Sequence, residues 1–267
     1  MTQSDFDTRA VPGPNRRAVL GTALGAVALA ATGGTRALGQ APVRNIVLVH
    51  GAWADGSCWT DVIARLQATG FNVTAVQNPL TALADDVAAT RRALALQDGP
   101  TVLVGHSWGG TVITEAGVDP KVVALVYVAA RAPDAGEDFA ALSARYPTMP
   151  ARAGVLKAGG FSRLSEEAFL KHFAGDVERS RARVLYAAQQ PIADDLFAGK
   201  TTVAAWRTKP SYYAVSTLDQ TTSPELERFL AARMKATTIE LASSHLSMIS
   251  HPKAIADLIQ LAATSTG

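Results

Sequence analysis

The sequence of 267 residues contains a single cysteine, Cys58, so no disulfide can form within the chain. The fold therefore does not depend on an oxidising compartment. An excess of one charge is also lacking, because 25 Lys and Arg residues are balanced by 23 Asp and Glu residues, for a formal net charge of +2. Four arginines and two aspartates within residues 1–39 account for that excess. No basic stripe remains in the rest of the chain, and we expect no nucleic-acid partner.

No apolar run reaches the roughly 20 residues that a stable membrane span needs. The most hydrophobic early segment, 18–31, is rich in Ala and Gly and follows the pair Arg16-Arg17. The arginine pair, this segment and the small-residue pattern Ala37-Leu38-Gly39 resemble a twin-arginine export signal. The sequence therefore predicts a cleaved signal over residues 1–39 and a bacterial protein that is exported, periplasmic or secreted. An uncleaved anchor or a disordered tail is the alternative.

Strand and helix patterns alternate through the predicted mature domain, residues 40–267. The run 45–50 is continuously apolar and rich in β-branched residues, which is typical of a strand buried on both faces. Further strands are expected at 71–76, 101–104, 122–129, 211–216 and 237–241. Helices are expected at 59–69, 81–97, after Ser107, at 224–234 and at 252–263. This order predicts an α/β fold with a mostly parallel sheet and helices on both faces.

The alternation stops between about residues 134 and 209. This stretch is mostly helical and irregular in pattern, and it contains scattered aromatic residues. A long insert after a central strand is typical of a cap over a functional site, so we predict a helical cap at 134–209. An additional helical layer is the alternative interpretation.

A candidate nucleophile lies between glycines at the end of a predicted strand. Gly105-His106-Ser107-Trp108-Gly109 matches the pattern G-x-S-x-G, which is weak evidence alone because only three positions are fixed. Its placement between a strand and a helix is the one that a strained turn presenting a serine requires. An ordinary turn would explain the glycines but not the serine between them. We therefore predict that Ser107 is a nucleophile.

A serine hydroxyl needs a base to take its proton, and the chain has five histidines. His245 follows the last predicted strand, where folds of this type carry the base, and His251 at a helix start is the alternative. Asp219 follows the strand before and would orient the imidazole. Asp134, after strand 122–129, is the alternative acid.

An oxyanion intermediate needs two backbone N–H donors. The residue after the nucleophile, Trp108, supplies the first. The loop His50-Gly51-Ala52 after the first strand would supply the second, which we assign to Ala52.

Together these segments resemble an α/β-hydrolase, in the branch that contains plant methylesterases, hydroxynitrile lyases and many bacterial esterases. The resemblance rests on residues 47–53, 104–110, 217–219 ahead of 224–226, and Ser244-His245 before a final helix. It implies a triad of Ser107, His245 and Asp219, an oxyanion hole at Ala52 and Trp108, and no metal or organic cofactor.

The resemblance also implies a serine carboxylesterase that acts on a small-molecule ester. The plant lyases of this branch carry a lysine directly after the catalytic histidine, and this chain has Leu246 there, which favours ester hydrolysis. The aromatic residues of the insert suggest an apolar acyl or alcohol group. The alternatives are a lactonase, a lyase-like or cofactor-free peroxidase-like activity, and a non-catalytic ligand-binding protein.

Overall fold

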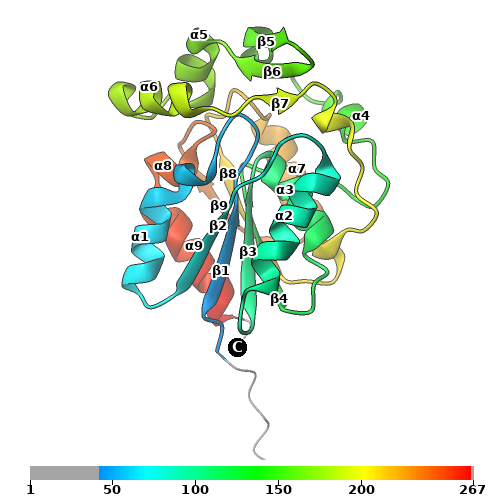
Figure 1. The fold of residues 1–267 in the computed structure, drawn as a ribbon, viewed down its shortest axis with the longest axis vertical. Coiled ribbons are helices and arrows are strands. Elements are labelled where there is room, and N and C mark those ends of the chain that lie inside the picture. The colour runs from blue at the N-terminus through cyan, green and yellow to red at the C-terminus, as the bar shows by residue number, and fades with distance from the viewer. Residues whose placement is uncertain (1–41, 266–267) are drawn as a thin grey trace, which may run out of the picture. The chain divides into compact units, whose positions relative to one another are not determined.

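A computed structural model describes residues 42–265 (Figure 1). The predicted export signal and its cleavage position lie outside the described residues. Between residues 42 and 265, no helix has the length and apolar character needed to cross a membrane.

The described core is a six-stranded sheet with the order β2-β1-β3-β4-β8-β9 (Figure 1). Its strands are β1 (Asn45–Val49), β2 (Asn72–Val76), β3 (Thr101–His106), β4 (Val122–Val128), β8 (Ser211–Ser216) and β9 (Thr237–Leu241). All neighbouring strands run parallel. Strands β1 and β3 are buried along their whole length, as their continuous apolar runs require. The predicted parallel sheet is confirmed.

Helices cover both faces of this sheet. Helices α1 (Thr60–Ala68) and α9 (Pro252–Thr264) pack together against one face, and α2 (Leu83–Ala95) and α3 (Trp108–Ala116) pack together against the other (Figure 1). Helix α7 (Pro224–Arg233) packs against β8 and is capped by the hydroxyl of Ser223. These bounds lie within a few residues of the predicted ones.

The insert between β4 and β8 is less helical than its pattern indicated. It contains an antiparallel three-stranded sheet of β5 (Val155–Ala158), β6 (Phe161–Leu164) and β7 (Ile192–Ala193). Its α-helices are α4 (Phe139–Ser143), α5 (Glu166–Ala168) and α6 (Arg179–Ala188). A π-helical turn, η3 (Phe169–Phe173), and the short 3₁₀ turns η2 (Pro150–Gly154), η4 (Leu196–Ala198) and η5 (Ala205–Arg207) complete it.

The sequence offered one signal for this small sheet. Gly159 and Gly160 join β5 to β6 and have φ values of +60° and +81°, which suit a two-residue hairpin turn. The strands themselves have four residues or fewer, β5 is mostly exposed and β6 alternates between exposed and buried residues, so they lack the apolar run that marks the buried strands of the main sheet.

Candidate active site

Ser107 occupies a strained turn between β3 and α3. Its φ of 51° and ψ of −119° are unfavourable for a residue with a side chain. The turn is held by backbone hydrogen bonds, since the carbonyl of Ser107 accepts from the N–H groups of Gly110 and Arg131, both at 3.0 Å. A Cβ at Gly109 would lie 2.5 Å from the carbonyl oxygen of Val49, so only glycine permits this packing. The tight turn therefore places Ser107, half-buried, at the carboxyl edge of the sheet.

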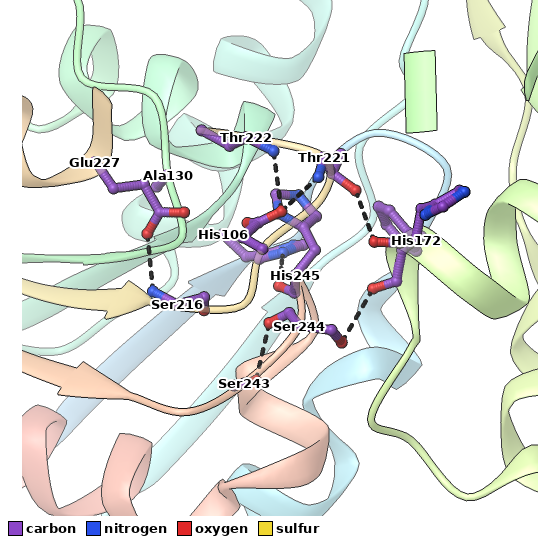
Figure 2. A network of polar contacts seen from close by, with 12 residues as sticks. His106, Ala130, His172, Ser216, Thr221, Thr222, Glu227, Ser243, Ser244 and His245 are labelled. Atoms are coloured by element: carbon purple, nitrogen blue, oxygen red, sulfur yellow. Dashed lines mark hydrogen bonds and ion pairs between the residues drawn. The ribbon is translucent and has the colours of Figure 1, made fainter. Parts of the chain in front are cut away.

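The structure brings Asp219 and His245 together. Nδ1 of His245 and Oδ2 of Asp219 are 2.5 Å apart, and both side chains are completely buried. Oδ1 of Asp219 accepts from the backbone N–H groups of Thr221 at 2.6 Å and Thr222 at 2.9 Å. Figure 2 shows Thr221, Thr222 and His106 gathered around His245. The carboxylate is thereby fixed in the position that orients the imidazole and leaves Nε2 free.

Nε2 of His245 is buried and has no hydrogen-bond partner in the described part of the chain. Ser107 forms no hydrogen bond to it in this structure. Such nucleophile–base contacts are often long until a substrate binds. The two residues still belong to one cluster, because the ring of His106, directly before Ser107, lies 4.8 Å from the His245 ring between centroids.

His106 is a site residue to which sequence reasoning assigned no role. Its Nε2 lies 3.0 Å from the backbone carbonyl of His245 and must donate, because a carbonyl only accepts. Burial, and to a smaller extent the neighbouring His245, hold the pKa of His106 well below its usual value. A neutral His106 therefore secures the loop of His245 without opposing a positive charge on that ring.

His50 holds the loop that contains Ala52. Its Nε2 accepts from the backbone N–H of Asn78 at 2.9 Å, so the ring proton is on Nδ1, which donates to the carbonyl of Gly51 at 2.9 Å. A Cβ at Gly51 would lie 2.7 Å from Cβ of Ser107, so the loop runs directly beside the serine. Among the described residues, no partner takes the backbone N–H of Ala52 or of Trp108. Both donors are available next to Ser107.

The alternative acid and base lie elsewhere. Asp134 pairs with Arg207 at the surface, and the hydrogen bond from Arg207 lowers the pKa of Asp134. His251 lies at the start of α9, and its Nε2 is 3.2 Å from the carbonyl of Ala242. Among the described residues, neither forms a hydrogen bond or an ion pair with His245 or Ser107.

A second carboxyl group lies behind Asp219, and sequence reasoning missed it. Glu227 in α7 is completely buried, and its Oε2 accepts from the backbone N–H of Ser216 at 3.0 Å (Figure 2). Burial and then the nearby carboxylate of Asp219 hold the pKa of Glu227 well above its usual value. The raised pKa favours the protonated, neutral form of Glu227 beside the Asp219–His245 pair. The only sequence signal for this residue was a glutamate three residues after Pro224, within the helix expected at 224–234.

Aromatic side chains of the insert close the site from above. The ring of Phe173 lies 5.1 Å from His245 and 6.4 Å from Trp53, and Phe197 lies 5.8 Å from Trp53, all between ring centroids. A small cavity of about 10 Å³, barely enough for one water, is lined mostly by apolar side chains, among them Trp53, Phe173 and Leu246. It lies beside the residue that follows His245, and Ser107 does not line it.

The indole ring of Trp108 is anchored by a buried carboxylate. Its Nε1 donates to Oδ2 of the buried Asp86 at 2.7 Å, and Oδ1 of Asp86 accepts from the backbone N–H of Leu80 at 2.8 Å. The indole ring is therefore held in place, while the backbone N–H of the same residue remains available to bind an oxyanion.

No group of three or more His, Cys, Asp or Glu side chains between residues 42 and 265 is placed to hold a metal ion. The polar groups that converge on the site are those of an acyl-transfer centre, namely a serine, an imidazole, a carboxylate and backbone donors.

Comparison with known proteins finds relatives that are esterases. A carbendazim-hydrolysing esterase of Nocardioides sp. (strain SG-4G) is 34% identical over 135 residues, which cover 45% of this chain and 54% of that enzyme. The match thus spans about half of the relative. An esterase of Oryza sativa subsp. japonica is 24% identical over 81% of this chain and 94% of its own.

Solved structures share the fold. Polyneuridine aldehyde esterase superposes with a TM-score of 0.71 at 18% identity, over 81% of this chain and 98% of that one. Residues 46–258 match the description of the alpha/beta hydrolase family over most of the chain. With the parallel sheet and the serine turn at its carboxyl edge, this match shows that the chain belongs to the alpha/beta hydrolase family.

Proposed function

We propose that this protein is a serine carboxylesterase. The observation that carries the proposal is the buried Asp219–His245 pair, whose free Nε2 lies in one cluster with the strained turn of Ser107. The names of its relatives, which are esterases, support the same class of reaction.

The reaction follows from these positions. Oγ of Ser107 attacks the ester carbonyl carbon while Nε2 of His245 takes the hydroxyl proton, and Asp219 stabilises the resulting imidazolium. The backbone N–H groups of Ala52 and Trp108 bind the oxyanion. The C–O bond to the alcohol then breaks, and His245 returns its proton to the leaving oxygen. Water, deprotonated by His245, attacks the acyl-enzyme and releases the acid and Ser107.

The substrate has an apolar part. Trp53, Phe173 and Phe197 surround the approach to His245 and offer no charge to an acyl or alcohol chain. The buried apolar side chain of Leu246, directly after His245, provides no cation for a cyanide leaving group. Ester hydrolysis therefore fits these residues better than lyase chemistry.

The test is the hydrolysis of p-nitrophenyl butyrate by the protein and by Ser107→Ala. We expect Ser107→Ala to remain folded, to lose hydrolysis and to lose labelling by a fluorophosphonate. Ser180→Ala removes an exposed serine at the start of α6 and serves as the control that keeps both. Unchanged turnover in Ser107→Ala would disprove the assignment of the nucleophile.

We also propose export with cleavage of residues 1–39. The support is the pair Arg16-Arg17 ahead of the weakly hydrophobic segment 18–31. N-terminal sequencing of the exported protein should begin near Gln40, and a product that retains the arginine pair would contradict cleavage.

A further inference from the structure

Arg131 is fixed to the turn that carries the nucleophile. It follows β4, and its backbone N–H donates to the carbonyl of Ser107 at 3.0 Å. The preceding residue, Ala130, is held on both sides by the hydroxyl of Tyr213, which accepts from its N–H at 2.9 Å and donates to its carbonyl at 2.5 Å. The backbone of Arg131 is therefore hydrogen-bonded directly to the serine turn.

The guanidinium of Arg131 lies among three aromatic rings. Its central carbon is 4.2 Å from the ring centroid of Phe139 and 5.2 Å from those of Trp108 and Phe197. Trp108 carries one oxyanion donor, and Phe197 also packs against Trp53 in the loop beside Ser107. The cation thus lies beside the ring of the residue that follows Ser107 and beside an aromatic residue of the insert.

Arg131 differs from two other arginines that stack on aromatic rings, because no carboxylate pairs with it. Arg207 and Arg233 also stack on an aromatic ring, but they pair with Asp134 and Glu137. In residues 42–265, Arg131 has neither an ion pair nor a side-chain hydrogen bond, and its Nε is buried without a partner.

An unpaired cation with a buried Nε is costly, and the aromatic rings offset only part of that cost. Burial lowers the pKa of Arg131 to about 9, so the group is still charged at neutral pH. Its N–H donors match the two oxygens of a carboxylate, and the surrounding rings limit the water that would screen the pair. The residue is only half-buried, so a ligand can reach it.

We propose that Arg131 binds a carboxylate carried by the ester substrate, at the end of an apolar segment leading away from the scissile bond. The inference rests on the proposed esterase function and narrows its substrates to half-esters of dicarboxylic acids and similar anionic esters. The apolar segment contacts the aromatic rings, and the terminal carboxylate supplies the counter-charge that Arg131 lacks.

Two esters of equal chain length test this inference. The p-nitrophenyl half-ester of glutaric acid ends in a carboxylate where p-nitrophenyl valerate ends in a methyl group. We expect Arg131→Met to reduce the ratio of kcat/KM for the anionic ester to that for the neutral ester by about tenfold or more, mainly through KM. Arg131→Lys keeps the charge and should reduce this ratio by less.

The matched control is Arg163→Met. Arg163 also stacks on a ring, 5.0 Å from the centroid of Tyr186, but it is exposed on β6. Its substitution should leave the ratio of kcat/KM for the two esters as it is in the unaltered protein. An equal ratio in Arg131→Met and the unaltered protein would overturn the inference.

Binding without turnover separates this inference from the esterase proposal. Glutarate should bind to Ser107→Ala in calorimetry and lose its affinity in Ser107→Ala/Arg131→Met, whereas 1,5-pentanediol should bind to neither. If no ester is hydrolysed but glutarate binds through Arg131, the esterase proposal fails and the anion site remains. If esters are hydrolysed but glutarate does not bind Ser107→Ala, the anion site is wrong.

If Arg131→Met does not fold, inhibition of the unaltered protein replaces the variant. Competitive inhibition by glutarate but not by the diol would support the anion site, and a lack of inhibition by glutarate would overturn the inference.

Discussion

Nε2 of His106 donates a hydrogen bond to the backbone carbonyl of His245 across 3.0 Å, although the two residues are 139 positions apart in the chain. This bond joins the residue before the nucleophile to the residue that serves as its base in the proposed mechanism. Because His106 is neutral and buried, it can hold His245 without repelling its protonated form.

We expect His106→Phe to impair both stability and turnover. The phenyl ring fills the space but leaves the His245 carbonyl unpaired, which costs about 1–3 kcal/mol. A loss of this size in transition-state positioning corresponds to roughly tenfold or more in kcat. His106→Gln retains a donor and should lose less of both. Urea unfolding and p-nitrophenyl butyrate kinetics measure the two effects, and equal losses in the two variants would argue against this bond.

Substitution of the two candidate acids should give unequal results. Asp219→Asn removes the charge that stabilises the His245 imidazolium, and we expect kcat to fall by about 10³–10⁴-fold. Asp134→Asn breaks an exposed surface pair with Arg207, which contributes little to stability, and should change kcat little. Steady-state kinetics of both variants at one pH decide the matter. A larger loss in Asp134→Asn would move the acid to Asp134.

We expect Phe173 to restrict the acyl group that the site accepts. Its ring packs on Phe169 at 4.9 Å and on His245 at 5.1 Å, so Phe173→Ala opens space beside the base. We expect a loss of about 3–5 kcal/mol in stability and a shift of kcat/KM towards longer acyl chains in a series of p-nitrophenyl esters. Phe161→Ala, at an exposed position on β6, is the control for both readouts. An unchanged chain-length profile in Phe173→Ala would show that the acyl group binds elsewhere.

Glu227 should make stability depend on pH. Its pKa is raised by burial and by Asp219, with Tyr213 and Arg228 as the other charged or titratable groups close by. In the folded state Glu227 keeps its proton above pH 4.5, the ordinary glutamate value, whereas in the unfolded chain it does not. Its stabilising contribution is therefore complete below that pH and is lost as pH rises towards the raised pKa, at most about 1.4 kcal/mol per pH unit.

The variant Glu227→Gln isolates this effect. The amide accepts from the Ser216 N–H and donates towards Asp219 at every pH, so the variant should gain stability over the unaltered protein as pH rises from 5 to 8. Thermal unfolding across this range measures the difference in Tm. A difference that does not change with pH would mean that Glu227 is already ionised in the folded protein.

Much of the framework was predictable from local sequence. The buried runs of β1 and β3 and the glycines around Ser107 are local features, because strand burial and a sharp turn each demand particular residues at adjacent positions. Asp219 and His245 were chosen from their order after the strands β8 and β9, and the structure joins them by a hydrogen bond. Their catalytic roles stay predictions that the variants above test.

Tertiary structure decided the rest. The small sheet of the insert has strands of four residues or fewer, too short to show a clear period in the sequence. The burial of Glu227 behind Asp219 and the lack of a carboxylate at Arg131 depend on which distant segments meet at the carboxyl edge of the sheet. The sequence by itself thus determined the strands, the serine turn and the candidate acid and base. Only folding determined which buried groups are neutral, paired or left without a partner, because desolvation and contact depend on neighbours in space rather than along the chain.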